Sequence, residues 1–327
     1  KMTKYSSSNH SFYFLGLIIF LGIIKYNTGI NFTIFLYQNE NLINLICLFL
    51  ILSIGISHGS LDHIKGKKLL KFYKLEKIFI FYLSYIFISL LIIFFWSLFP
   101  AFTLLIFLII ASYHFGKEDS IKFESAVFKG VSKKFFKPNY NFLSFTLKGS
   151  MIIIFPLFFH FRETIEIFEL LWVNNEYFEN SLSYISKNDF IVITILLTPV
   201  IANYFMVRDG DDFAFMYMEL ISVLALNVIF TPLIAFTVYF CFLHSIRHSA
   251  SLIHELDNKD FKKGFQKFIK KALPLTLVTA VLFILSVYVL TNYYVLNDAI
   301  LKVIFIGLAS LTFPHILLEY LIEKNEK

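Results

Sequence analysis

Two histidines stand four residues apart near the end of a long apolar run, in the segment YFCFLHSIRHS that contains His244 and His248. On a helix this spacing places both imidazoles on one face, about one turn apart, where both can reach one metal ion. Neutral imidazole binds iron, zinc and copper, and a histidine within a membrane span is costly unless it has a partner or a function. The pair alone is a modest indication of a metal site.

The composition is that of an integral membrane protein. Of 327 residues, 57% are hydrophobic and only 16% are charged, and the mean hydropathy is +0.71. These values lie far from those of a soluble domain. The formal charge of +6 comes largely from lysines in short loops between apolar runs, which indicates membrane topology and argues against nucleic-acid binding. Cys47 and Cys241 both lie inside apolar runs, so neither a disulfide framework nor a thiolate metal cluster is expected.

We predict an all-α fold, a polytopic transmembrane bundle of about ten spans (range about 8–10), because each span needs about 17 to 25 mostly apolar residues. One integral-membrane domain is expected over residues 1–327. The first span is expected to be retained, since no small-residue cleavage site follows it. The predicted spans, in chain order, are residues 11–26, 42–60, 77–96, 100–116, 143–160, 190–207, 213–230, 232–250, 273–292 and 299–321.

The loop lysines predict the orientation, because lysine and arginine accumulate on the cytoplasmic side of a membrane. Three loops are rich in lysine: residues 65–77, 117–137 and 259–271. With ten spans, all three lie on one side together with both termini, so the N- and C-termini are expected in the cytoplasm. The longest loop on the other side, residues 162–189, is mostly acidic.

This topology predicts that five histidines approach the cytoplasmic face at similar depth. A lone histidine in such a position is more simply explained as a hydrogen-bonded interface residue. Five at one level, on four spans that run the same way, favour a metal site, because side chains on facing helices of a bundle converge. They are His58, His114, His244, His248 and His315.

The residues beside His58 and His315 have local interpretations. Asp62 lies four residues after His58 and could hydrogen-bond the far nitrogen of a ligand imidazole. His63 is about 140° round a helix from His58, so it is not expected to share the metal and is interpreted as a loop histidine. His315 follows a proline that breaks the last span, and its alternatives are a fifth ligand, a group that supports a ligand, or part of a cavity wall.

Charged residues beside the other histidines are also candidates. Glu118 or Asp119 could support a ligand imidazole, although acidic residues in a basic loop are more often solvated charges. Arg247 stands between the paired histidines and is expected to point away from them, toward a lipid phosphate or a carboxylate such as Asp62 or Asp119.

The expected ligand set limits the chemistry. Four neutral histidines and no carboxylate leave the full charge on a divalent ion, which favours a redox metal with open positions for dioxygen over a hydrolytic zinc site. A substrate that enters from lipid would be apolar, and dioxygen also partitions into lipid. An iron oxygenase acting on a membrane-dissolved hydrocarbon fits these conditions.

Four segments together resemble the Brp/Blh family of bacterial and archaeal β-carotene 15,15'-dioxygenases: SHGSLDH, ASYHFGKED, YFCFLHSIRHS and LTFPHILLEYLI. The resemblance runs in the same order over residues 50–325 and leaves the first span outside. It implies a multi-span enzyme that uses O2 to cleave the central double bond of β-carotene into two molecules of retinal. It also implies Fe2+ held by the residues that match the family's histidines, which are His58, His114, His244 and His248.

We expect the polyene to lie in an aromatic-lined tunnel whose length places the central bond beside the iron. β-Carotene and O2 would arrive from the membrane lipid, and the retinal would pass to a microbial rhodopsin. The expected location is the inner cell membrane, with the metal site near its cytoplasmic face. The candidate wall residues, each of which ordinary packing or lipid contact would also explain, are Phe115, Tyr239, Phe240, Phe242 and Phe313.

Two other classes of protein remain as alternatives. A membrane di-iron hydroxylase or desaturase also uses histidine boxes, but its site needs about eight histidines, and this chain has nine in total with no adjacent pair. A transporter with histidines along its route should place polar groups at several depths and often has internal repeats, which are not evident here. The dioxygenase interpretation is favoured over both.

Overall fold

The computed structural model describes residues 4–120, 138–173, 176–206, 212–257 and 259–326, and in these ranges the chain is helical with no strand. Most of the predicted lysine loop 117–137 and the turn at 207–211 lie outside the described residues. The first half of the chain forms α1 (Lys4–Thr28), α2 (Ile30–Gln38), α3 (Glu40–Leu50), η1 (Ile51–Gly55), η2 (Gly59–Leu61), α4 (Asp62–Phe72), α5 (Ile78–Leu98), α6 (Pro100–Ser120), α8 (Pro138–Gly149) and α9 (Met151–Phe159). The second half forms α10 (Phe161–Leu170), α11 (Glu176–Lys187), α12 (Asp189–Met206), α13 (Asp212–Ile229), α14 (Pro232–Val238), η3 (Tyr239–Ser245), α15 (Ile246–Leu256), α16 (Phe261–Leu290) and α17 (Leu296–Glu326).

Six described helices are long and apolar enough to cross a membrane, and a seventh span results if α8 and α9, bent by 41°, are counted as one. The all-helical membrane architecture predicted from the sequence is therefore supported, whereas the count of ten spans stays a prediction. The loop predicted over residues 162–189 also contains two helices, α10 and α11. The six are His10–Thr28, Glu40–Phe72, Ile78–Leu98, Pro100–Ser120, Phe261–Leu290 and Leu296–Glu326.

The outer surface of the bundle is apolar, which is typical of proteins that cross a membrane. Helix α5 carries no charged residue, and it exposes large side chains such as Phe79, Phe87 and Leu90. Soluble monomers rarely expose contiguous apolar patches of this kind. A side chain that faces hydrocarbon costs nothing to expose there, so the sequence retains a continuous apolar helix at this position.

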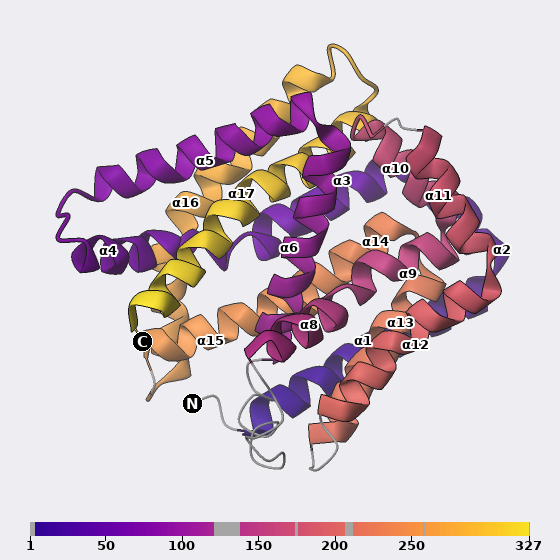
Figure 1. The fold of residues 1–327 in the computed structure, drawn as a ribbon, viewed down its shortest axis with the longest axis horizontal. Helices are drawn as coiled ribbons and strands as arrows, with labels where there is room; N and C mark the ends of the chain where they lie inside the picture. Colours follow the sequence, from indigo (N-terminus) through magenta and orange to yellow (C-terminus); the bar gives the residue numbers. More distant parts are fainter. Residues whose placement is uncertain (1–3, 121–137, 174–175, 207–211, 258, 327) are drawn as a thin grey trace.

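The last helix, α17, organises one half of the molecule. It packs against α3, α4, α5, α6 and α16, and Figure 1 shows α4, α5, α16 and α17 side by side. In the other half, α1 packs on α13, and α12 packs on both α8 and α13. Helix α6 lies between the two halves because it contacts α5 and α17 on one side and α8 on the other.

Two π-helical turns interrupt the helices that meet at the centre. The turn η1 ends at Gly55, the turn η3 spans Tyr239–Ser245, and the two pack against each other. The hydroxyl of Ser245 donates to the Gly55 carbonyl oxygen at 2.9 Å, which satisfies a backbone acceptor beside the irregular turn. A Cβ atom on Gly55 would lie 2.6 Å from the Phe240 ring, so only glycine permits this approach. Single π turns of this kind are frequent at functional sites.

A polar turn joins α15 to α16. The Asp257 carboxylate accepts from Lys267 Nζ at 2.8 Å and from the backbone amides of Lys259 and Asp260. The Lys267 ammonium, with these amides, lowers the pKa of Asp257 to about 2. The carboxylate is therefore ionised at neutral pH and holds the turn at the start of α16.

Candidate metal centre

The five histidines named from the sequence come from four separate parts of the fold. His58 follows the π turn η1, His114 lies on α6, His244 lies in the π turn η3, His248 on α15 and His315 on α17 directly after Pro314. All five are buried, and His244 has no exposed surface at all.

The imidazole rings converge on one point. The ring centroid of His58 lies 5.4 Å from that of His244, 5.1 Å from that of His248 and 5.5 Å from that of His315. The His114 ring lies 5.2 Å from both His244 and His315. The five rings therefore lie close together, as the topology predicted. Their role as metal ligands stays a prediction.

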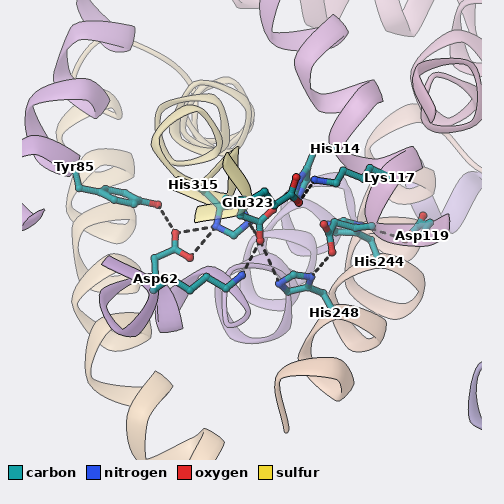
Figure 2. A network of polar contacts seen from close by, with 12 residues as sticks. Asp62, Tyr85, His114, Lys117, Asp119, His244, His248, His315 and Glu323 are labelled. Atoms are coloured by element: carbon teal, nitrogen blue, oxygen red, sulfur yellow. Dashed lines mark hydrogen bonds and ion pairs between the residues drawn. The ribbon is translucent and has the colours of Figure 1, made fainter. Parts of the chain in front are cut away.

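Three of the imidazoles are held from outside by carboxylates. His244 Nδ1 donates to Asp119 Oδ1 at 3.3 Å, and His248 Nδ1 donates to Glu118 Oε2 at 2.9 Å. Figure 2 shows Asp119 beside His244 on one side of the cluster. Asp62, the carboxylate that contacts the third imidazole, lies on the opposite side. A carboxylate can only accept, so each contact places the proton on Nδ1 and leaves Nε2 as a lone pair.

The third carboxylate, Asp62, contacts an imidazole of the cluster as the sequence suggested, but the ring is that of His315 and not that of its sequence neighbour His58. Asp62 accepts from His315 Nδ1 at 2.8 and 2.9 Å and from the Tyr85 hydroxyl at 3.1 Å. The reason is local: the 3₁₀ segment η2 lies between residues 58 and 62, so the regular i, i+4 stacking of an α-helix does not apply. His63 binds the Ser60 carbonyl oxygen with Nδ1 at 2.9 Å, outside the cluster.

The inner nitrogens lack partners. Among the described residues, the buried atoms without a hydrogen bond include His58 Nδ1 and the Nε2 atoms of His244, His248 and His315. Leaving a buried polar atom unpaired costs about 1–3 kcal/mol, so four such atoms facing one another require an explanation. A bound cation would satisfy such atoms. The ligand atoms of His58, His114 and His315 already lie within 4.8 Å of one another, and so do those of His248, His315 and Glu319.

Glu319 lies among these nitrogens but was not predicted from the sequence. Its Oε1 accepts from Lys65 Nζ at 2.8 Å and lies 3.9 Å from His248 Nε2 and 3.8 Å from His315 Nε2. Its Oε2 lies 3.7 Å from His114 Nδ1. The spacing of four residues after His315, in the segment HILLE, is the feature of the sequence that could have identified it.

Arg247 is also placed differently from the prediction. It is buried, donates to Glu219 Oε1 at 2.5 Å and donates to the backbone carbonyl of Asp119 at 3.2 Å. The expectation of a carboxylate partner is met, but by Glu219 of α13 and not by the carboxylates of Asp62 or Asp119, and Ser11 of α1 also accepts from Arg247, so the guanidinium does not reach a lipid phosphate. Lys148 completes the arrangement, 3.3 Å from Glu219 Oε2 and 3.1 Å from the Asp119 carbonyl oxygen.

The five aromatic candidates take three kinds of position. Phe115 lies 4.8 Å from His244 between ring centroids, and Phe240 stacks on His244 at 5.9 Å. Tyr239 has a polar role, since its hydroxyl donates to Asp119 Oδ2 at 2.7 Å. Phe242 and Phe313 are half-buried and pack against the hydrophobic core. The substrate tunnel stays a prediction for all five.

The fold and the site together define a helical protein of membrane-spanning type that buries a cluster of histidines and carboxylates. Comparison with known families matches residues 49–323 to the family "Beta-carotene 15,15'-dioxygenase". The chain therefore belongs to the beta-carotene 15,15'-dioxygenase family, and both the resemblance and the enzyme class predicted from the sequence are confirmed.

A curated relative agrees with this assignment. It is named beta-carotene 15,15'-dioxygenase, comes from uncultured marine bacterium 66A03, and is 27% identical over 282 residues, which are 85% of this chain and 93% of the relative. No solved structure matches this chain significantly. Neither the di-iron hydroxylase nor the transporter alternative is favoured by these findings.

Proposed function

We propose that this protein is an iron-dependent membrane dioxygenase that cleaves the central 15,15' double bond of β-carotene with O2 to give two molecules of all-trans-retinal. The single observation that carries the metal requirement is the group of unpartnered imidazole nitrogens that face one another in a buried site. Membership of the family carries the choice of substrate.

The charges around the site support a divalent cation. Among the described residues that surround the histidines, five carboxylates face three cations, so neutral histidines leave an excess of two negative charges. Burying unbalanced charge is costly, and one divalent ion would remove the imbalance. The carboxylates are Asp62, Glu118, Asp119, Glu219 and Glu319, and the cations are Lys65, Lys148 and Arg247.

His58, His114, His244 and His248 are the proposed ligands. Fe2+ bound there would supply the redox chemistry with dioxygen that no side chain provides. Glu118 and Asp119 hold two of the rings in the tautomer whose lone pair faces inward. Phe115 and Phe240 pack against the rings and exclude water from one side of the site.

The apolar exterior supports a substrate that reaches the site from the membrane lipid. β-Carotene would enter from the lipid and lie along aromatic side chains near the histidines, and its central bond would be selected by position. The product, retinal, would be available to a microbial rhodopsin. We place the protein in the inner membrane with ten spans, both termini in the cytoplasm and the metal centre near the cytoplasmic face.

Expression in bacteria that accumulate β-carotene tests the proposal. We expect the cells to lose their orange colour and to contain retinal, detected by chromatography. His248→Ala should abolish the retinal, because it removes a proposed ligand. His254→Ala, a change on the same helix α15, should retain it. Unchanged β-carotene in cells that express the wild-type protein well would overturn the proposed function.

A further inference from the structure

Glu319 faces the histidines from the last helix. It lies one turn after His315 on α17, is 9% exposed, and its two oxygens approach the nitrogens of three imidazoles. The proposed function gives Glu319 no role, since all four proposed ligands of the metal ion are histidines.

The distances are the first part of the argument. The three separations between Glu319 oxygens and imidazole nitrogens are 3.7, 3.8 and 3.9 Å. They exceed the 3.2 Å that limits a good N–H···O hydrogen bond. With ion-to-ligand distances of about 2.1 Å, two donors that share an ion are separated by about 3.4 Å in a tetrahedron and at most about 4.2 Å. The observed values fall in that interval.

The proton positions are the second part. The Nδ1 atoms of His248 and His315 already donate to Glu118 and Asp62. With Nδ1 as the donor, each ring in its neutral form presents the lone pair of Nε2 to the Glu319 carboxylate, and neither Nε2 has a hydrogen-bond partner. A lone pair that faces a carboxylate oxygen in a buried site is repelled unless a cation lies between them. Glu319 and these imidazoles are arranged as donors around one positive charge.

We propose that Glu319 is a ligand of the metal ion, held in place by Lys65. This inference rests on the proposed function only in requiring that the centre binds a metal. Lys65 Nζ donates to Oε1 at 2.8 Å, which orients the carboxylate as a hydrogen-bonded support does. Glu319 would then be a fifth donor beside the four histidines of the proposed function, and it would bring one negative charge to the divalent ion.

Binding of Co2+ and Fe2+ to the purified full chain in detergent tests this proposal. Glu319→Gln keeps the shape and can still accept from Lys65, but an amide is a poor ligand. We expect it to weaken Co2+ binding by more than about 10-fold, measured by competition with a chelator, and to shift the visible absorption bands of bound Co2+. Lys65→Met removes the ammonium and retains the carboxylate. It should leave the bands in place and weaken binding far less.

The outcomes separate this inference from the proposed function. If wild-type protein binds neither ion, both are overturned. If wild-type protein binds metal and Glu319→Gln has the wild-type affinity and spectrum, only the inference fails. Equal losses of affinity in the two variants, with the Co2+ bands unshifted in both, would also overturn it, because Glu319 would then act only as the ion partner of Lys65. If Glu319→Gln does not give a monodisperse protein, Glu319→Asp is measured in its place, and an unshifted spectrum there counts against the proposal.

Discussion

At the scale of single residues, the site depends on pairs of imidazole and carboxylate. Each carboxylate sets which nitrogen carries the proton, and so which nitrogen is free to bind. Asp119 has the most contacts, because its carboxylate accepts from His244 Nδ1 and Tyr239 and its backbone carbonyl accepts from Lys148 and Arg247. Asp119 therefore connects the imidazole cluster to the buried ion pairs around Glu219.

Asp119→Asn tests this connection. The amide cannot act as a charged acceptor for both the imidazole and the phenol, so His244 loses its fixed orientation. We expect metal affinity to fall by about 10- to 100-fold, measured as metal per chain after dialysis against a chelator. Glu323→Gln is the matched control, since Glu323 pairs with Lys117 on a half-exposed surface. Similar losses in both variants would contradict an orienting role for Asp119.

At the scale of elements, the close contact between α6 and α8 positions His114. A Cβ atom on Gly116 would lie 1.7 Å from the Phe145 carbonyl oxygen, and one on Gly149 would lie 1.9 Å from the Ser112 carbonyl oxygen. Both obstacles are backbone atoms, so the helices themselves would have to separate. His114 lies two residues before Gly116 and would move with α6.

Gly116→Ala should therefore destabilise the protein by about 3 kcal/mol, at the upper end for an overpacked contact. The measurement is thermal unfolding in detergent, together with metal content. Gly16→Ala on α1 is the control, because nothing lies within 4 Å of the added Cβ atom. There the loss of glycine should stabilise the helix by about 0.5–1 kcal/mol. An unchanged unfolding temperature in Gly116→Ala would show that the two helices can separate at little cost.

At the scale of the whole molecule, the predicted orientation places the lysine-rich loops on one side of the membrane. Helix α16 has 30 residues, which corresponds to about 45 Å and is enough to cross a bilayer. Its two ends should therefore lie on opposite sides. Lys71 and Lys262 lie near the expected cytoplasmic face, and Tyr293 follows the other end of α16.

Cysteine labelling tests this topology. Cys47 and Cys241 are both buried, so a membrane-impermeant maleimide should label only introduced cysteines. We expect Tyr293→Cys to react in intact cells, and Lys71→Cys and Lys262→Cys to react only after permeabilisation. Lys71→Cys and Lys262→Cys reacting from opposite sides would contradict the predicted span count.

The sequence by itself determined the membrane class, the all-helical fold and the five histidines. These follow from local properties, because apolar runs of sufficient length predict spans and buried histidines in such runs are costly enough to be informative. The lysine distribution also placed His58, His114, His244, His248 and His315 at one depth before any packing was known. Residue type and position along the chain are sufficient for each of these inferences.

Only the tertiary structure decided which carboxylate serves which histidine. His315 meets Asp62 across 253 residues, and His248 meets Glu118 across 130. Such pairs depend on how helices rotate and pack against one another, and interrupted helices break the regular spacing that sequence arguments use. The sequence therefore predicted that Asp62 supports an imidazole but could not say that the ring is that of His315, and it did not identify Glu319. The inward direction of the unpartnered nitrogens, from which the metal centre is argued, exists only once the helices have packed.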